Sequence, residues 1–448
     1  MKIIFNKIFF INKNNLFYIL SFLAIIGTIN VSPYEIFMLT TSVWIIDYIN
    51  GLRILFFLIA SLLIIYKFIN NVHKVGLNNF KSKILLVLLT SFIIQIISTF
   101  INYQVNFIIN EPKLIHGLFL NYSAIIVCLF FLLINDEKTF LQIIFIFISA
   151  LVVFYIPLSI IILFDWLTND LTAMYFSNII RHGTLFLETP LPRSTGIARI
   201  ILLFFVICLV ITNSYKRLRI NNFLIFFFAF LIVSFQSRFS LYMLPIILLL
   251  FEILKGFKFK NLLRNFIIFL ILPYALYSSI GFSKFFLKYN SVENISERVQ
   301  KANEKSKYGN RSLYGITLKE PTVARTQSEI ITSGRTTVWI DIIEKLKSKN
   351  FITGFGAHSD RLLLNDGKYK NFGNNASNIY LYSMFTGGIF SLILIIIFNL
   401  LIILKIVKNI FSNKTNTILS ALIIITFFTR GLLEISYGFF GIDLLIVL

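Results

Sequence analysis

Charged residues are scarce in this chain. Of its 448 residues, 57% are hydrophobic and only 14% are charged, whereas soluble domains average about 45–50% apolar and about 25% charged residues. A water-soluble protein could not bury this much apolar surface. The composition therefore excludes a cytosolic enzyme and a free secreted domain, and it indicates a membrane protein.

Residues that hold disulfides, metals and nucleotides are also scarce. The two cysteines, Cys128 and Cys208, lie inside apolar runs and offer neither a disulfide framework nor a metal site. None of the four histidines has metal-ligand spacing. The chain lacks a phosphate-binding Walker A loop, and it lacks an Asp-x-Asp pair for a metal-bound nucleotide sugar. We therefore expect no metal and no other cofactor, and we expect neither an ATP-driven pump nor a zinc enzyme.

Long apolar blocks recur along the chain, and a spanning helix needs about 20 apolar residues. The pattern predicts an all-α polytopic membrane protein with eleven to twelve transmembrane helices. The last of these, 438–448, is short enough to be a partial span. The other predicted spans are 16–31, 52–69, 84–109, 114–134, 139–164, 197–212, 222–235, 239–254, 262–282, 378–404 and 418–435.

The positive charges predict the topology. The net charge is +21, but Lys and Arg gather in alternate connections between the apolar blocks, as at Lys216, Arg217 and Arg219. This pattern favours membrane topology and a lipid bilayer partner over nucleic acid. The first block has no cleavage site after it and is expected to be a signal anchor. We expect a multi-pass membrane protein with a cytoplasmic N-terminus.

One connection is far longer than the others. Residues 283–377 contain 16 Lys and Arg and 9 Asp and Glu, and long loops cross the membrane regardless of charge. We therefore expect a large periplasmic loop that separates an N-terminal bundle, 1–282, from a C-terminal membrane segment, 378–448. The second half of the loop has helical spacing and predicts an apolar stripe of Val338, Trp339, Ile342, Ile343 and Leu346. The turn glycines Gly354 and Gly356 mark its end.

Arginines on the predicted outer side are the candidate binding residues. A guanidinium binds phosphate with two hydrogen bonds and cannot lose its charge, so several in one pocket would suit a diphosphate. The alternative is that each arginine only anchors a helix end at the head groups. Arg430 and Glu434 are four residues apart, and on one helix they would form an ion pair. The candidates are Arg193, Arg199, Arg238, Arg335 and Arg430.

Candidate bases and stacking residues lie in the same regions. His358 can act as a base near neutral pH, although a solvated loop histidine is the simpler interpretation. Glu188 and Glu434 are further candidate bases. Trp339 and Tyr380 can stack on sugars, but aromatic residues also gather at membrane interfaces for reasons unrelated to binding.

Several short motifs, taken in order, resemble the O-antigen polymerase and O-antigen ligase superfamily. The matching pieces cover the C-terminal part of the chain. They are Arg193-Ser194-Thr195-Gly196-Ile197, Ser237-Arg238, Ser333-Gly334-Arg335 followed by Trp339, Ile352-Thr353-Gly354-Phe355-Gly356, Asn378-Ile379-Tyr380-Leu381, Gly387-Gly388-Ile389-Phe390 and Arg430-Gly431-Leu432-Leu433-Glu434.

The resemblance implies a metal-independent glycosyltransferase of the C-type architecture. It would lie in the bacterial inner membrane with its active site facing the periplasm, and its donor would be an undecaprenyl-diphosphate-linked oligosaccharide. The arginines would contact the diphosphate, and Trp339, Asn378 and Tyr380 would contact the glycan. A chain-length regulator protein is a further expected partner.

One departure from the family pattern separates its two branches. The ligases commonly carry a histidine immediately before the asparagine of the Asn-x-x-Leu piece, and here that position is Ser377. This favours the polymerase (Wzy-type) branch, which joins repeat units into O-antigen or a related surface polysaccharide. The alternatives are a ligase that transfers glycan to lipid A-core, and a flippase or exporter of the same lipid-linked glycan. The flippase alternative is disfavoured because the chain shows no repeat-related halves.

Overall fold

The computed structural model describes residues 13–28, 43–72, 79–102, 111–168, 194–214, 220–290, 335–364, 376–410, 415–438 and 441–448. Within these ranges the secondary structure is helical, with no strand. The chain forms two compact units. Unit 1 combines Met1–Ser32, Thr40–Val152 and Ile331–Leu448, and unit 2 combines Pro33–Leu39 with Val153–Ile330.

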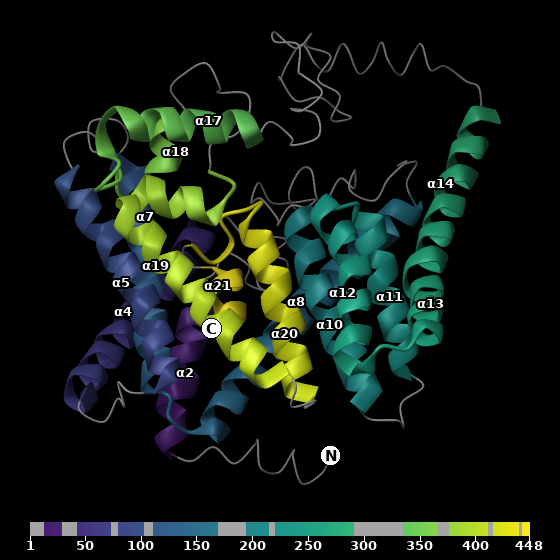
Figure 1. The fold of residues 1–448 in the computed structure, drawn as a ribbon, viewed down its shortest axis with the longest axis horizontal. Coiled ribbons are helices and arrows are strands. Elements are labelled where there is room, and N and C mark those ends of the chain that lie inside the picture. Colours follow the sequence, from purple (N-terminus) through teal and green to yellow (C-terminus); the bar gives the residue numbers. More distant parts are fainter. Residues whose placement is uncertain are drawn as a thin grey trace. The chain divides into compact units, whose positions relative to one another are not determined.

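Unit 1 is a bundle in which α5 and α19 pack along each other. Helix α5 also packs against α7, α4 packs against α2 and α7, and α19 packs against α20. Helix α17 lies at one end of this unit and runs across the direction of α19 (Figure 1). The elements are α2 (Lys13–Gly27), α4 (Val43–Asn71), α5 (Phe80–Ile101), α7 (Glu111–Leu133), the first half of α8 (Glu137–Thr168), α17 (Arg335–Lys345), η4 (Leu346–Asn350), α18 (Ser359–Leu363), α19 (Ile379–Ile410), α20 (Thr415–Gly431), η5 (Ser436–Gly438) and α21 (Ile442–Val447).

The described part of unit 2 starts in the second half of α8. Helix α10 packs against α11 and α12, and α11 packs against α14. Trp166 near the end of α8 stacks on Tyr277 of α14, with 5.4 Å between ring centroids. The other elements are α10 (Ser194–Ser214), α11 (Ile220–Phe235), α12 (Arg238–Gly256), α13 (Phe259–Phe266), η3 (Ile267–Ile271) and α14 (Leu272–Asn290).

The helices confirm the expected all-α polytopic membrane architecture. Seven described helices are long and apolar enough to cross a membrane, and four shorter apolar helices accompany them. Each of the eleven full spans predicted from the sequence corresponds to one of these helices. In the described part of the predicted partial span, helix α21 has 6 residues and is too short to cross a bilayer.

The helical proline Pro273 coincides with a change of helix type. It is the second residue of α14, directly after the π-helical turn η3. A proline cannot donate a backbone hydrogen bond, and its ring crowds the preceding turn. A single π turn widens the helix at this point, so the chain crosses the proline without a break between α13 and α14.

Candidate functional site

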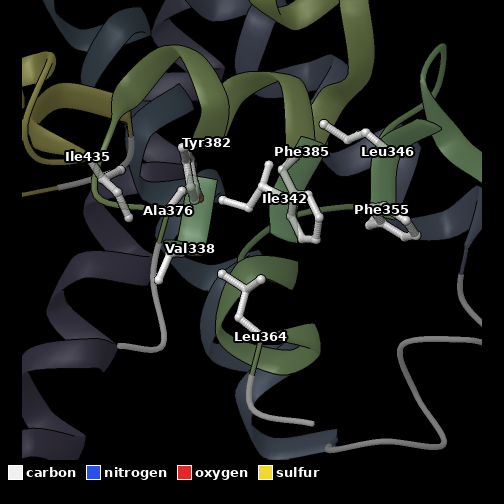
Figure 2. Packing of buried hydrophobic residues seen from close by; sticks show 9 residues of the cluster. All are labelled: Val338, Ile342, Leu346, Phe355, Leu364, Ala376, Tyr382, Phe385 and Ile435. Atoms are coloured by element: carbon white, nitrogen blue, oxygen red, sulfur yellow. The ribbon is translucent and has the colours of Figure 1, made fainter. Parts of the chain in front are cut away.

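Helix α17 packs on α19 through an apolar stripe. Val338, Ile342 and Leu346 are buried against Tyr382 and Phe385 of α19, together with Phe355, Leu364, Ala376 and Ile435 (Figure 2). Burial of each such side chain contributes about 1.5–3 kcal/mol. The predicted loop helix is therefore confirmed for these three positions. Ile343 also lies in the predicted helix, but its side chain is 40% exposed.

The first residue of α17 forms an ion pair with a distant carboxylate. The Nη2 atom of Arg335 donates to Oε1 of Glu434 over 2.9 Å, and the two side chains are 31% and 32% exposed. Glu434 lies in the turn after α20, and its backbone N–H donates to the carbonyl of Arg430 over 2.8 Å. Two expected site residues from different motifs are thus in direct contact at a position that water can reach.

Arg430 forms a second ion pair, and this one is buried. Its guanidinium pairs with the carboxylate of Asp443 in α21, and the side chains are 10% and 2% exposed. The expected pairing of Arg430 with Glu434 along one helix is not found, because α20 ends at Gly431 and Glu434 lies beyond it. Breaking a buried pair costs about 3–5 kcal/mol, whereas an exposed pair contributes about 0–1 kcal/mol. Arg430 is therefore held in the packing, and Arg335 is much easier to release.

Asn378 caps helix α19. Its Oδ1 accepts hydrogen bonds from the backbone N–H groups of Tyr380 and Leu381, over 2.9 and 3.1 Å. Its Nδ2 donates to the carbonyl of Leu432 over 3.0 Å, which ties the start of α19 to the turn that carries Glu434. An asparagine cap of this kind satisfies donors that the first helical turn leaves open. Asn378, which the sequence singled out as a glycan contact, thus also has the structural role of capping α19.

The two expected aromatic contacts also make internal hydrogen bonds. Nε1 of Trp339 donates to the carbonyl of Ala376 over 2.9 Å, which joins α17 to the segment before α19. The hydroxyl of Tyr380 accepts from Nδ2 of Asn399 over 2.8 Å, and Tyr437 donates to Oδ1 of the same asparagine over 2.8 Å. Each ring remains half-buried in the described part of the chain, so part of its surface is left for a ligand.

Two glycine motifs meet backbone to backbone. Helix α19 kinks at Gly388, where φ is 68°. The carbonyls of Phe385 and Thr386 accept from the N–H groups of Phe355 and Gly356, over 2.7 and 2.8 Å. The Gly-Phe-Gly turn thus provides hydrogen-bond donors for carbonyls at the kink. A membrane helix tolerates such a break only where neighbouring groups satisfy the freed backbone groups.

Only glycine fits at this meeting point. A Cβ at Gly388 would lie 1.9 Å from the carbonyl oxygen of Ile352, and one at Gly354 would lie 2.4 Å from the backbone nitrogen of Gly388. Both residues also have positive φ, which L side chains rarely adopt. The close approach fixes the depth at which the turn docks on α19.

Polar side chains of α5 and its C-cap form hydrogen bonds to the same turn and to neighbouring helices. The hydroxyl of Thr99 accepts from the N–H of Ala357 over 2.7 Å, and Nδ2 of Asn102 donates to the carbonyl of Gly354 over 3.0 Å. Deeper in the bundle, Nε2 of Gln95 donates to Ser391 of α19 over 3.2 Å, and Oε1 of Gln95 accepts from Asn121 of α7. Polar contacts of this kind hold membrane helices together, so the turn is attached to the bundle core.

His358 is buried, with an unusual backbone conformation. Its φ is 58°, and it directly precedes α18. Its ring lies edge to face with that of His116 on α7, with 5.8 Å between centroids. A Cβ at Gly117 would lie 2.4 Å from the Cβ of His358, so α7 needs glycine there. Sequence reasoning did not single out His116, because nothing local links it to a residue 242 positions later.

The remaining candidates are placed differently. Arg199 on α10 and Arg238 at the start of α12 belong to unit 2, whereas Arg335, His358, Trp339, Asn378, Tyr380, Arg430 and Glu434 belong to unit 1. Arg238 is exposed and follows Gln236, whose φ is 49°. Glu188 and Arg193 lie outside the described residues.

No protein-family model matches the chain, and neither a curated protein nor a solved structure does.

Proposed function

We propose that this protein polymerises undecaprenyl-diphosphate-linked oligosaccharide repeat units into O-antigen or a related surface polysaccharide. One observation carries the proposal: motif pieces that lie far apart in the sequence are in contact within unit 1. Arg335 pairs with Glu434, Asn378 bonds to Leu432, and the Gly354 turn docks on Gly388. If each motif residue only anchored a helix end at the lipid head groups, there would be no reason for the motif pieces to lie in contact with one another.

The proposed reaction is displacement at an anomeric carbon. A hydroxyl oxygen of the acceptor repeat unit forms a new bond to that carbon of the donor glycan. The bond from carbon to the diphosphate oxygen breaks, and the undecaprenyl diphosphate leaves with the bonding electrons. The proton of the acceptor hydroxyl passes to a base. Negative charge grows on the leaving diphosphate, and positioned guanidinium groups stabilise it.

Arg335 is the arginine of unit 1 best suited to the leaving group. It is about one third exposed, and its present partner is a surface carboxylate. Arg430 is committed to the buried carboxylate of Asp443, so we assign it to the scaffold that holds the turn with Glu434. Arg193, Arg199 and Arg238 remain proposed contacts of the diphosphate, as the motif resemblance implies.

Three groups are proposed as the acceptor base: His358, Glu434 and Glu188. Trp339, Asn378 and Tyr380 are proposed to contact the glycan. Loss of a general base lowers a rate by about 10²–10⁴-fold. His358→Ala tests that role, and Ser377→Ala is its comparison, because a serine hydroxyl cannot accept a proton at neutral pH. Complete loss of polymer in Ser377→Ala would contradict the polymerase assignment.

The site is proposed to face the periplasm from the inner membrane, in a C-type glycosyltransferase arrangement, with a chain-length regulator as partner. The decisive experiment is gel profiling of surface glycan in a strain that lacks the chain. A polymerase deletion leaves single repeat units on the surface, a flippase deletion leaves none, and a ligase deletion leaves glycan that is not attached to lipid A-core.

Variants of the complemented strain sharpen this test. Arg335→Ala should insert normally and give single units, since removal of one such donor costs about 10²–10³-fold in rate. The matched control is Asp341→Asn, which alters the ion pair of Asp341 with Lys345 on the same helix, 3.1 Å apart. A wild-type ladder in Arg335→Ala, at equal protein levels, would show that this arginine is an ordinary anchor.

A further inference from the structure

The guanidinium of Arg335 is bound to an anionic side chain of the protein itself. Its Nη2 lies 2.9 Å from Oε1 of Glu434. A carboxylate and a phosphate offer a guanidinium the same kind of acceptor, two oxygens spaced for its planar donors. The position that the proposed function gives to the donor diphosphate is thus occupied by a side chain of the protein itself.

We infer that Glu434 is an exchangeable stand-in for the diphosphate, an inference that rests on the proposed function. The donor diphosphate displaces the Glu434 carboxylate from Arg335 when it binds. The carboxylate returns to Arg335 after transfer, and this return promotes release of the undecaprenyl diphosphate product. In this exchange Glu434 acts through Arg335 and positions it, a role separate from that of the acceptor base, for which His358 and Glu188 are the other candidates.

The exposure of the pair makes exchange feasible. Both side chains are about one third exposed, so water already solvates part of each charge, and separation creates no buried charge. The pair of Arg430 and Asp443 is the contrast within the same unit. Its side chains are 10% and 2% exposed, and separation there would leave charges uncompensated in the interior.

The remainder of α17 stays docked when the pair opens. Val338, Ile342 and Leu346 bury the helix against α19, and Trp339 bonds to the carbonyl of Ala376. These contacts do not involve Glu434. Release of the carboxylate therefore frees the guanidinium for a ligand without moving the helix that presents it.

The exchange also makes the site selective for charge. A ligand must attract Arg335 more strongly than one carboxylate does. A glycan-linked diphosphate carries two negative charges, whereas a glycan linked to its lipid through a single phosphate carries one. An uncharged or singly charged glycan carrier would leave the Arg335–Glu434 pair intact. The expected ligand class is therefore a lipid-linked diphosphate.

The test measures binding of undecaprenyl diphosphate to the full-length protein in nanodiscs. Arg335→Ala should weaken the Kd by at least about ten-fold, because a charge-assisted contact is lost. Glu434→Gln keeps the shape but removes the competing charge, and should tighten the Kd by roughly two- to five-fold. That gain should vanish in the Arg335→Ala, Glu434→Gln double variant. The control Asp341→Asn should bind as the wild type does.

The outcomes separate the two proposals. If Arg335→Ala weakens binding but Glu434→Gln leaves it unchanged or weaker, the exchange is overturned and the proposed diphosphate site stands. If the Kd does not depend on Arg335 at all, both the exchange and the assigned role of Arg335 are overturned. Glu434→Ala, with the same expected tightening, replaces the glutamine variant if the latter fails to fold, as judged by its melting temperature.

Discussion

Arg335 and Glu434 stand 99 positions apart in the chain, and their side chains form an ion pair 2.9 Å long. One residue opens a helix that lies across α19, and the other lies in the turn that follows α20. The pair connects two parts of the chain that the spacing of apolar residues could not relate. It is also the contact on which the proposed diphosphate site depends.

The buried pair of Arg430 and Asp443 should dominate the stability of the C-terminal segment. Asp443→Asn removes the carboxylate charge from a guanidinium that is largely buried, and should lower the free energy of unfolding by about 3–5 kcal/mol. Thermal unfolding in detergent measures the change. Asp341→Asn, in the more exposed pair with Lys345, should change it by less than about 1 kcal/mol. Equal effects in the two variants would show that burial of the first pair has no energetic consequence.

Gly388→Ala should undock the Gly-Phe-Gly turn from α19. The new Cβ would lie 1.9 Å from the carbonyl oxygen of Ile352, and the backbone conformation at this position, with φ 68° and ψ −165°, costs an alanine about 1–3 kcal/mol. Lower thermal stability and faster proteolysis near the turn are expected. Gly51→Ala in α4 is the control, because its Cβ meets nothing within 4 Å. It should be neutral, or up to about 1 kcal/mol stabilising.

The start of α8 should become less stable in acid. The hydroxyl and the backbone N–H of Thr139 donate to Asp136, over 2.9 and 3.0 Å, and these bonds lower the pKa of that carboxyl. Because the folded-state pKa lies below the unfolded value, the contribution to stability is present at neutral pH. It is lost as the pH falls through the lowered pKa, below about pH 4.

Two variants isolate this effect. Asp136→Asn keeps a capping side chain that does not titrate, so the acid-dependent part of the unfolding free energy should disappear. Asp136→Ala should lose about 0.5–2 kcal/mol at neutral pH, because the cap itself is gone. Hydrogen exchange at the first turn of α8, measured at pH 7 and at pH 3.5, reports both changes. An unaltered pH profile in Asp136→Asn counts against the assignment.

The predicted topology places Lys138 and Lys347 on opposite sides of the membrane. Both residues are exposed, so cysteines at these positions should be accessible to a thiol reagent. With Cys128 and Cys208 replaced by alanine, a reagent that cannot cross the membrane should label Lys347→Cys in intact cells and spare Lys138→Cys. Labelling of Lys138→Cys alone would reverse the orientation and remove the basis for a periplasmic site.

Helix formation and its register were predictable from the sequence. The eleven apolar blocks predicted the apolar helices because a membrane span needs a continuous run of about 20 apolar residues, and neighbouring residues supply it. Val338, Ile342 and Leu346 predicted the buried face of α17 because residues three and four apart share one side of a helix. Both signals are local, so no partner needs to be known.

The partners of the charged and polar side chains were decided only by the tertiary structure. Arg430 and Glu434 have the spacing of a pair on one helix, but α20 ends at Gly431, and each charge meets a residue from another segment. The ring of His116 contacts that of His358 because α18 packs against α7. Such contacts depend on how helices pack and where they end. In a mostly apolar chain, few residues of the sequence indicate either the packing partner or the end of a helix. The apolar pattern of the sequence thus determines which segments become helices, whereas the packing of those helices determines which charged side chains come into contact.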